Sequence, residues 1–224
     1  MIKAAIFDMD GLLIDSEPLW RRVHRQVFRK AGVIITPRHD RMMLGHRTNE
    51  AVEIIYRDQP WEGLSLEEVE AMITREIIAA IKKDGVLKPG VHQALSVCKE
   101  AGLRVAIASS SPPEVIDAVV DTLEIRERFE HIYSAQYEEL GKPHPAVFLS
   151  VARHFKVAPQ DCLVFEDSPA GVLAAKSAKM ICVAVPEEQS EGHAFIGTAD
   201  EVLGSLEEFD AALLKRLERA VQPG

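Results

Sequence analysis

Short apolar runs recur along the chain, and longer stretches with helical spacing separate them. The runs are continuous rather than alternating, as in strands that are covered on both faces. They lie at residues 4–7, 105–109, 131–134, 163–165 and 181–185. Between them, residues 114–123 and 146–155 place apolar side chains every three or four positions, and residues 171–178 are rich in alanine. Strand and helix therefore alternate, which predicts an α/β fold with a parallel sheet.

The region after the first predicted strand breaks this alternation. From residue 18 to about residue 83 the pattern predicts only amphipathic helices, at 20–30, 49–58 and 66–82. A βαβ crossover needs far fewer residues. We therefore expect a doubly wound, Rossmann-like core of residues 1–15 and 86–224, and an inserted all-helical cap of residues 16–85. The alternative is that these helices cover one face of the sheet. Residues 206–219 predict a final amphipathic helix.

Composition narrows the class of protein. The chain has 224 residues, of which 47% are hydrophobic and 27% charged, with three cysteines in separate apolar stretches. This profile is typical of a globular protein with reduced, buried thiols, and it favours the cytoplasm. We expect neither secretion nor a membrane-spanning segment, because the first residues and the later apolar windows do not match such signals. The net charge of -9 would repel a phosphate backbone, so we expect no nucleic-acid partner. An anionic ligand needs a local positive pocket.

Two carboxylates follow the first strand. Asp8 and Asp10 are alternate residues of an extended chain, so both face one small volume beyond the strand. In open α/β sheets, ligands bind at this edge. Two neighbouring acids do not ionise together easily, so one can stay a proton donor while the other acts as a nucleophile. An acidic turn is the alternative interpretation of the same pattern.

Three serines follow the second strand. Ser111 with Glu114 matches a capping box, and the proline that comes next suits a first helical position, so a helix is expected to start here. Its N-terminus would attract a phosphate, with the Ser109 hydroxyl and the backbone of Ser110 and Ser111 as donors. The two prolines that follow remove two further donors. A simple helix cap is the alternative.

A lysine and a second acidic pair complete the candidate set. Lys142 precedes a proline at the head of a helix, where it is either a solvated surface charge or a compact cation beside the acids. Glu166 and Asp167 follow the fourth strand, just before a Ser-Pro helix start. With Asp8 they form an oxygen-only set that suits Mg²⁺. A partner for the helix dipole is the alternative for Asp167.

The ordered set of motifs resembles the haloacid dehalogenase superfamily, in particular its β-phosphoglucomutase-like, sugar-phosphate phosphatase branch with a helical cap. The resemblance spans essentially the whole chain, and residues 5–17 and 164–171 carry it most specifically. The loop of residues 44–47 is also similar to the substrate-specificity loop of that family. There Arg47 would either clamp a small anionic substrate or be an exposed surface charge.

The resemblance implies a role for each motif. Asp8 would attack phosphorus and become an aspartyl-phosphate, while Asp10 would protonate the departing alcohol and then activate water. Ser109 and Lys142 would hold the transferring phosphoryl group, and Ser110 would help to bind the substrate.

The resemblance also implies a bound Mg²⁺ ion. Asp167, Asp8 and the main-chain carbonyl of Asp10 would be its ligands. Glu166 would bind this metal directly or through water.

Three reactions fit this family: phosphatase, phosphomutase and dehalogenase. Asp10 argues against a dehalogenase, because halide needs no proton to leave. Mutases of this branch place a histidine in the first cap helix, and here none occurs before His24, which favours a phosphatase. We therefore expect a Mg²⁺-dependent hydrolase of small phosphorylated sugars or sugar alcohols. A receiver-like signalling module is the non-enzymatic alternative, and a cap that opens and closes suggests a monomer.

Overall fold

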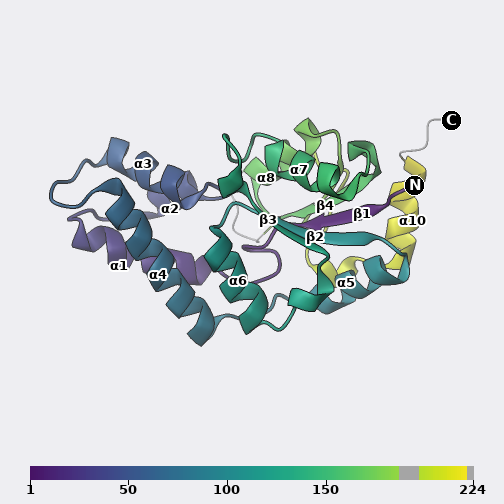
Figure 1. Ribbon diagram of the computed structural model, residues 1–224, viewed down its shortest axis with the longest axis horizontal. Helices are drawn as coiled ribbons and strands as arrows, with labels where there is room; N and C mark the ends of the chain where they lie inside the picture. The colour runs from purple at the N-terminus through teal and green to yellow at the C-terminus, as the bar shows by residue number, and fades with distance from the viewer. Residues whose placement is uncertain (187–196, 221–224) are drawn as a thin grey trace.

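A parallel six-stranded sheet forms the centre of the structure, a computed structural model that describes residues 1–186 and 197–220 (Figure 1). Its strand order is β3-β2-β1-β4-β5-β6. The strands are β1 (Ala4–Phe7), β2 (Arg104–Ser109), β3 (His131–Ser134), β4 (Cys162–Glu166), β5 (Ile181–Ala184) and β6 (Glu201–Val202). The predicted α/β class is confirmed. The two-residue β6 is too short to leave an apolar pattern, and the sequence did not predict it.

Helices cover both faces of the sheet. Because side chains alternate along a strand, Ala4 and Ile6 pack in one apolar core, and Ala5 and Phe7 pack in the other. The first core includes α7 (Ala146–Phe155) and α8 (Pro169–Ser177). The second includes α5 (Val91–Glu100), α6 (Pro113–Thr122) and α10 (Ala211–Ala220). Strands buried on both sides explain why the apolar runs in the sequence are continuous.

The insert between β1 and α5 is helical, as expected. It contains α1 (Glu17–Lys30), α2 (Pro37–Met43), α3 (Thr48–Asp58) and α4 (Leu66–Asp84), which lie together beyond one end of the sheet (Figure 1). α4 packs against α1 and α3 within the insert, and against α6 of the core. The chain passes between the two parts twice, and Ile14 bridges Leu87 where it does so. We keep the boundaries at 15/16 and 85/86 as a proposal.

The C-terminal tail departs from the prediction. Residues 206–208 form one turn of 3-10 helix, and α10 begins only at Ala211. Phe209 is fully buried in an extended conformation between them, and the Asp210 side chain accepts a hydrogen bond from the Leu213 amide. Burying this ring against the sheet outweighs continuing the helix, so the prediction of one helix over 206–219 is wrong in its first turn.

The three cysteines are free and buried, as the sequence indicated. Within residues 1–186 and 197–220, no helix combines the length and the apolar character that a bilayer crossing requires.

His24 lies on the buried face of α1, with its ring 5.4 Å from that of Trp20 and 6.0 Å from that of Phe28. Burial, assisted by the charge of Arg25, lowers the pKa of His24 from 6.5 to about 4. In the unfolded chain this histidine takes up a proton near its ordinary pKa, whereas the folded protein keeps it neutral. The free energy of unfolding therefore falls as the pH falls through this range.

We expect His24→Gln to remove this slope. Between about pH 7.5 and about pH 5, the wild type should lose about 2 kcal/mol more stability than the variant. Urea unfolding at the two pH values measures the difference. His92, exposed on α5, is the matched control, and His92→Gln should keep the wild-type slope. Equal slopes for wild type and His24→Gln would contradict the prediction.

Candidate active site

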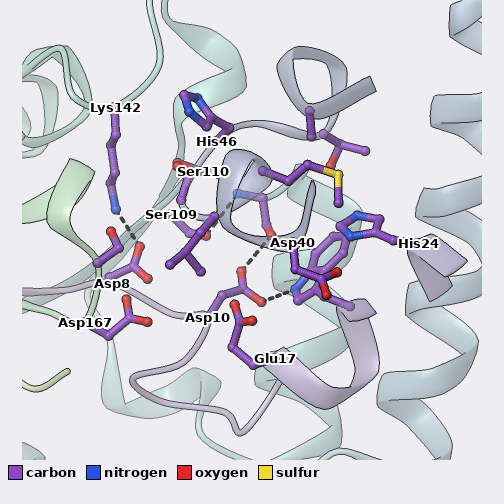
Figure 2. Close-up of a pocket in the computed structure, with 18 of the residues that line it drawn as sticks. Asp8, Asp10, Glu17, His24, Asp40, His46, Ser109, Ser110, Lys142 and Asp167 are labelled. Carbon is purple, nitrogen blue, oxygen red and sulfur yellow. Dashed lines mark hydrogen bonds and ion pairs between the residues drawn. The ribbon is translucent and has the colours of Figure 1, made fainter. Parts of the chain in front are cut away.

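The carboxyl ends of β1, β2 and β4 meet at one edge of the sheet, next to the cap. β1 lies between β2 and β4 in the strand order, so the residues after these strands face a common space. Asp8 follows β1, Ser109 ends β2 and Glu166 ends β4, while Lys142 enters from the loop before α7. Figure 2 shows Asp8, Asp10, Ser109, Lys142 and Asp167 around this space. Strand ends where the order changes direction are the usual ligand site of such sheets.

Lys142 is buried and uses all three of its N–H donors. Its Nζ lies 2.5 Å from Asp8 Oδ1, 2.6 Å from Glu166 Oε1 and 3.3 Å from the Ala108 carbonyl oxygen. Burial alone would lower the pKa of Lys142, but the carboxylates of Asp8 and Glu166 outweigh it and raise the pKa. The lysine is therefore a fixed cation in contact with Asp8, and the alternative of a solvated surface charge is wrong.

Glu166 orients this lysine. One carboxylate oxygen accepts from Lys142, and the other accepts from the backbone N–H and the hydroxyl of Ser168, each at 3.0 Å. A Cβ on residue 171 would lie 1.7 Å from Glu166 Oε1, so the carboxylate fits only because this position is glycine. Ser168 also accepts from the Gly171 amide and caps α8, as predicted. With both oxygens occupied, Glu166 is held as a partner of Lys142.

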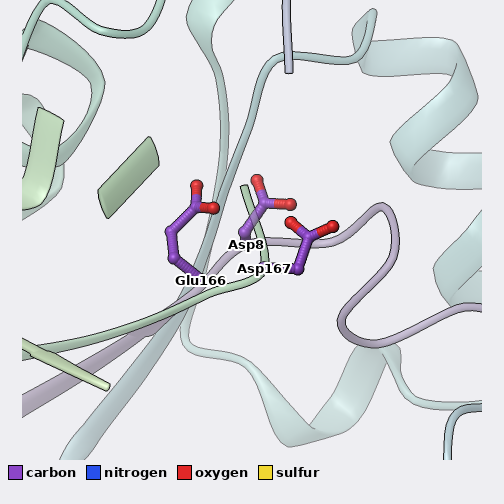
Figure 3. A group of neighbouring side chains, drawn as sticks. All are labelled: Asp8, Glu166 and Asp167. Carbon is purple, nitrogen blue, oxygen red and sulfur yellow. The ribbon is translucent and has the colours of Figure 1, made fainter. Parts of the chain in front are cut away.

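Asp8, Glu166 and Asp167 form a buried acidic cluster. Each offers an oxygen, and these oxygens lie within 4.8 Å of one another (Figure 3). Burial and the neighbouring carboxylates raise the pKa of Asp8 to about 7, against the lowering effect of Lys142, and raise the pKa of Asp167 well above 3.8. Hard divalent cations prefer such oxygen ligands and would relieve this repulsion. The donor set therefore fits a metal ion.

Asp10 accepts hydrogen bonds on both carboxylate oxygens. Oδ1 accepts from the Ser16 hydroxyl at 2.8 Å and from the Trp20 indole N–H at 2.7 Å, and Oδ2 accepts from the Ser111 hydroxyl at 2.7 Å. Ser111 was expected to cap a helix, which is wrong: α6 starts at Pro113 without a side-chain cap bond. Pro112 is the N-cap residue of α6, and the Ser111 hydroxyl instead donates to the Asp10 carboxylate.

The other two serines divide their contacts between core and cap. The buried Ser109 hydroxyl accepts from the Ser111 amide at 3.0 Å, while the Ser110 hydroxyl donates to the Gly45 carbonyl of the cap at 2.9 Å. Both serines line the cavity. The Ser110 hydroxyl thus joins the cap to the core, and the predicted role of Ser110 in substrate binding would fall to its backbone.

Arg47 is neither exposed nor directed into the cavity. It is 9% exposed, and its guanidinium donates to the carbonyl oxygens of Ala135, Glu138 and Glu139 in the core and to Glu50. The expectation of an exposed charge is therefore wrong. The alternative of a substrate clamp stays a prediction that this geometry does not support, since Arg47 is not among the residues that line the cavity. No signal in the sequence shows that a cap arginine reaches backbone carbonyls about ninety residues away.

Core and cap together enclose the cavity. The core contributes Asp8, Asp10, Ser109, Ser110, Ser111, Lys142, Asp167 and Ser168, and the cap contributes Glu17, Trp20, Arg21, His24, Asp40, Met43, Leu44, Gly45, His46, Thr48 and Ala51. The sequence did not indicate Trp20, Ser16 and Ser111 as partners of Asp10. The available signal was the stretch of residues 16–20, because it matches the part of the first cap helix where mutases of this branch have a histidine.

The chain belongs to the haloacid dehalogenase-like hydrolase family, whose sequence model matches residues 2–179. It is 40% identical over 211 residues to hexitol phosphatase B of Escherichia coli strain K12, covering 94% of this chain and 95% of that one. It is 32% identical to a phosphorylated carbohydrates phosphatase of Thermotoga maritima, covering 79% and 82%. Its fold is similar to that of a β-phosphoglucomutase from Clostridium difficile, with a TM-score of 0.86, 25% identity and coverage of 99% and 100%. The family predicted from the motifs is confirmed.

Proposed function

We propose that this hydrolase is a Mg²⁺-dependent phosphatase of small phosphorylated sugars and sugar alcohols, acting through an aspartyl-phosphate. The observation that carries the proposal is the placement of Asp8. Its carboxylate contacts the Lys142 ammonium at 2.5 Å, and it belongs to an acidic cluster that suits a cation. Asp8 and Asp10 line the same cavity. A nucleophile, an acid/base and positive charge are the groups that phosphoryl transfer requires.

The reaction follows from these positions. An Asp8 oxygen attacks phosphorus, and the bond to the substrate oxygen breaks as Asp10 gives that oxygen a proton. Asp10 then takes a proton from a water molecule, which attacks the phosphorus of the aspartyl-phosphate and releases inorganic phosphate and Asp8. Lys142 and Ser109 stabilise the charge on the transferring group.

A magnesium ion would be held by Asp8, Asp167 and the main-chain carbonyl of Asp10, with Glu166 bound directly or through water. When bound, this ion would neutralise charge on the phosphoryl oxygens. Both Glu166 oxygens already have partners in the protein, which favours contact through water.

The cap wall supports a hydroxylated substrate. Asp40 lines the cavity, and one of its oxygens is buried without a hydrogen-bond partner, while the other pairs with Arg25. Glu17 and Thr48 of the same wall add oxygen acceptors. Carboxylates and hydroxyls can accept from the hydroxyl groups of a sugar or sugar alcohol. The named substrates of the two sequence relatives, hexitol and carbohydrate phosphates, have this chemistry.

The alternative function is a phosphomutase of the β-phosphoglucomutase type, which the fold similarity favours. A mutase returns its phosphoryl group to a sugar rather than to water. Here residues 16–20, the stretch that matches the start of the first cap helix of the mutases, contain no histidine. We therefore propose a hydrolase, and we propose further that it acts in the cytoplasm as a monomer without nucleic-acid or membrane partners.

The test is phosphate release across a panel of phosphorylated sugars and sugar alcohols, with and without Mg²⁺. We expect turnover of hexitol phosphates that EDTA abolishes and that Mg²⁺ restores, because the acidic cluster needs a cation. Mg²⁺ should also raise the melting temperature of the EDTA-treated protein, a reading that does not depend on substrate. β-Glucose 1-phosphate, assayed for glucose 6-phosphate, tests the mutase. Turnover unaffected by EDTA would contradict the metal, and absence of turnover on every ester would contradict the function.

A further inference from the structure

The cap supplies two of the three hydrogen bonds that hold Asp10. Ser16 and Trp20 lie at the start of α1, six and ten residues after Asp10, whereas Ser111 belongs to the core. Figure 2 shows Asp10 between the core residues and the cap residues Glu17, His24 and Asp40. The carboxylate is thus fixed by groups from both parts of the protein.

The three hydrogen-bond donors to Asp10 differ in the protonation states of the carboxyl group that they allow. A hydroxyl can turn and either donate or accept, so Ser16 and Ser111 suit either protonation state of the carboxyl group. The indole N–H of Trp20 can only donate, and it points at Asp10 Oδ1 from 2.7 Å. Oδ1 also receives the Ser16 hydroxyl. Oδ1 therefore acts only as a hydrogen-bond acceptor, so the proton of a protonated Asp10 is on Oδ2.

From this we infer that Trp20 is a positioning residue, which sets the rotamer of Asp10 and directs its proton-carrying Oδ2 to the core side, where the leaving oxygen is protonated. Trp20 itself touches no reacting atom. The inference rests on the proposed function, because it assigns Trp20 a task only if Asp10 is the acid/base. It explains why a residue with no titratable group lines the cavity beside the acid.

The expected signature is a dependence on the leaving group. An alkoxide leaving a hexitol phosphate needs a proton as its bond breaks, whereas p-nitrophenolate leaves without one. Trp20→Phe keeps an aromatic ring but removes the N–H donor, together with part of the volume of the indole. We expect kcat to fall about tenfold on a hexitol phosphate and less than about twofold on p-nitrophenyl phosphate, since a positioned acid contributes about 100-fold or more. A purely structural defect would lower both rates alike.

Trp61 provides the matched control. It is the other tryptophan of the chain, it lies in the cap, and its N–H donates to the Leu64 carbonyl rather than to Asp10. Trp61→Phe should leave the ratio of the two rates unchanged. Ser16→Ala removes the second donor to Oδ1 with little change in packing, and should shift the ratio in the same direction as Trp20→Phe. This variant carries the test if Trp20→Phe does not fold.

Asp10→Asn tests the acid/base role of Asp10 separately from the positioning role of Trp20. It should suppress turnover of the hexitol phosphate and leave a trace on p-nitrophenyl phosphate, and adding Trp20→Phe to it should change neither rate further. If Asp10→Asn leaves the rate on the hexitol phosphate near that of the wild type, the acid/base assignment fails, and the role of Trp20 fails with it. Asp10→Asn is expected to lower the rate on the hexitol phosphate more than the rate on p-nitrophenyl phosphate. If it does so, and Trp20→Phe lowers both rates equally or neither, only the inference about Trp20 is overturned.

Discussion

Asp8→Asn is expected to lower kcat by on the order of 10⁴-fold or more while the protein stays folded. The amide cannot attack phosphorus, and loss of a covalent nucleophile removes the central step of the reaction. The fold should tolerate the change, because the amide oxygen can still accept from Lys142. Burial also disfavours charge on Asp8, whose pKa is raised to about 7. Removing that charge should keep or raise the melting temperature of the metal-free protein near pH 8.

Steady-state phosphate release and a thermal melt measure the two halves of this prediction. Asp161→Asn is the matched control, because Asp161 pairs with Lys3 beside the amino end of β4, away from the cavity. Its kcat should remain near that of the wild type. A folded Asp8→Asn protein with a near-normal rate would show that Asp8 is not the nucleophile.

Lys142→Met is expected to impair both activity and stability. The change removes three hydrogen bonds and leaves the carboxylates of Asp8 and Glu166 buried without their cation. Breaking a buried ion pair from one side costs about 3–5 kcal/mol. Loss of a preorganised charge beside the phosphoryl group lowers kcat by about 10²-fold or more. Denaturant unfolding and kcat on a hexitol phosphate are the measurements.

Lys176 offers a comparison, since it pairs with Asp200 at the surface, where both side chains are about one third exposed. Lys176→Met should cost less than about 1 kcal/mol and leave kcat unchanged, as is usual for exposed pairs. Equal losses for the two lysines would contradict a special role for Lys142.

Much of the fold was readable from the sequence, because burial on both faces leaves continuous apolar strands. Residues 4–7 and 131–134 match β1 and β3 in full, and a stretch too long for a crossover indicated the helical insert. Helix α2 was not predicted, since its seven residues give a weak periodicity. The turn at 206–208 was also missed, because tertiary burial of Phe209 decides it.

The acidic cluster was predicted from its place after the strands, because parallel strands end at one edge, and Lys142 was a candidate from its place at the head of a helix. The hydrogen bonds that side chains make between separate helices, strands and loops were not predicted. Ser111 satisfied a local capping rule, yet its hydroxyl binds Asp10, which is 101 residues away in sequence. Arg47 bonds to carbonyls 88 to 92 residues away, and Trp20 bonds to Asp10 from another element ten residues away. Local patterns contain no information about such partners.

The bonds from Arg47 to the core end on main-chain oxygens, at positions 135, 138 and 139. Every amino acid presents the same carbonyl, so this attachment does not depend on which side chains the core loop carries. Evolution is therefore free to vary residues such as the exposed Glu139 without loosening the cap. Position 47 itself is constrained, because all of these bonds come from one guanidinium and depend on a single residue.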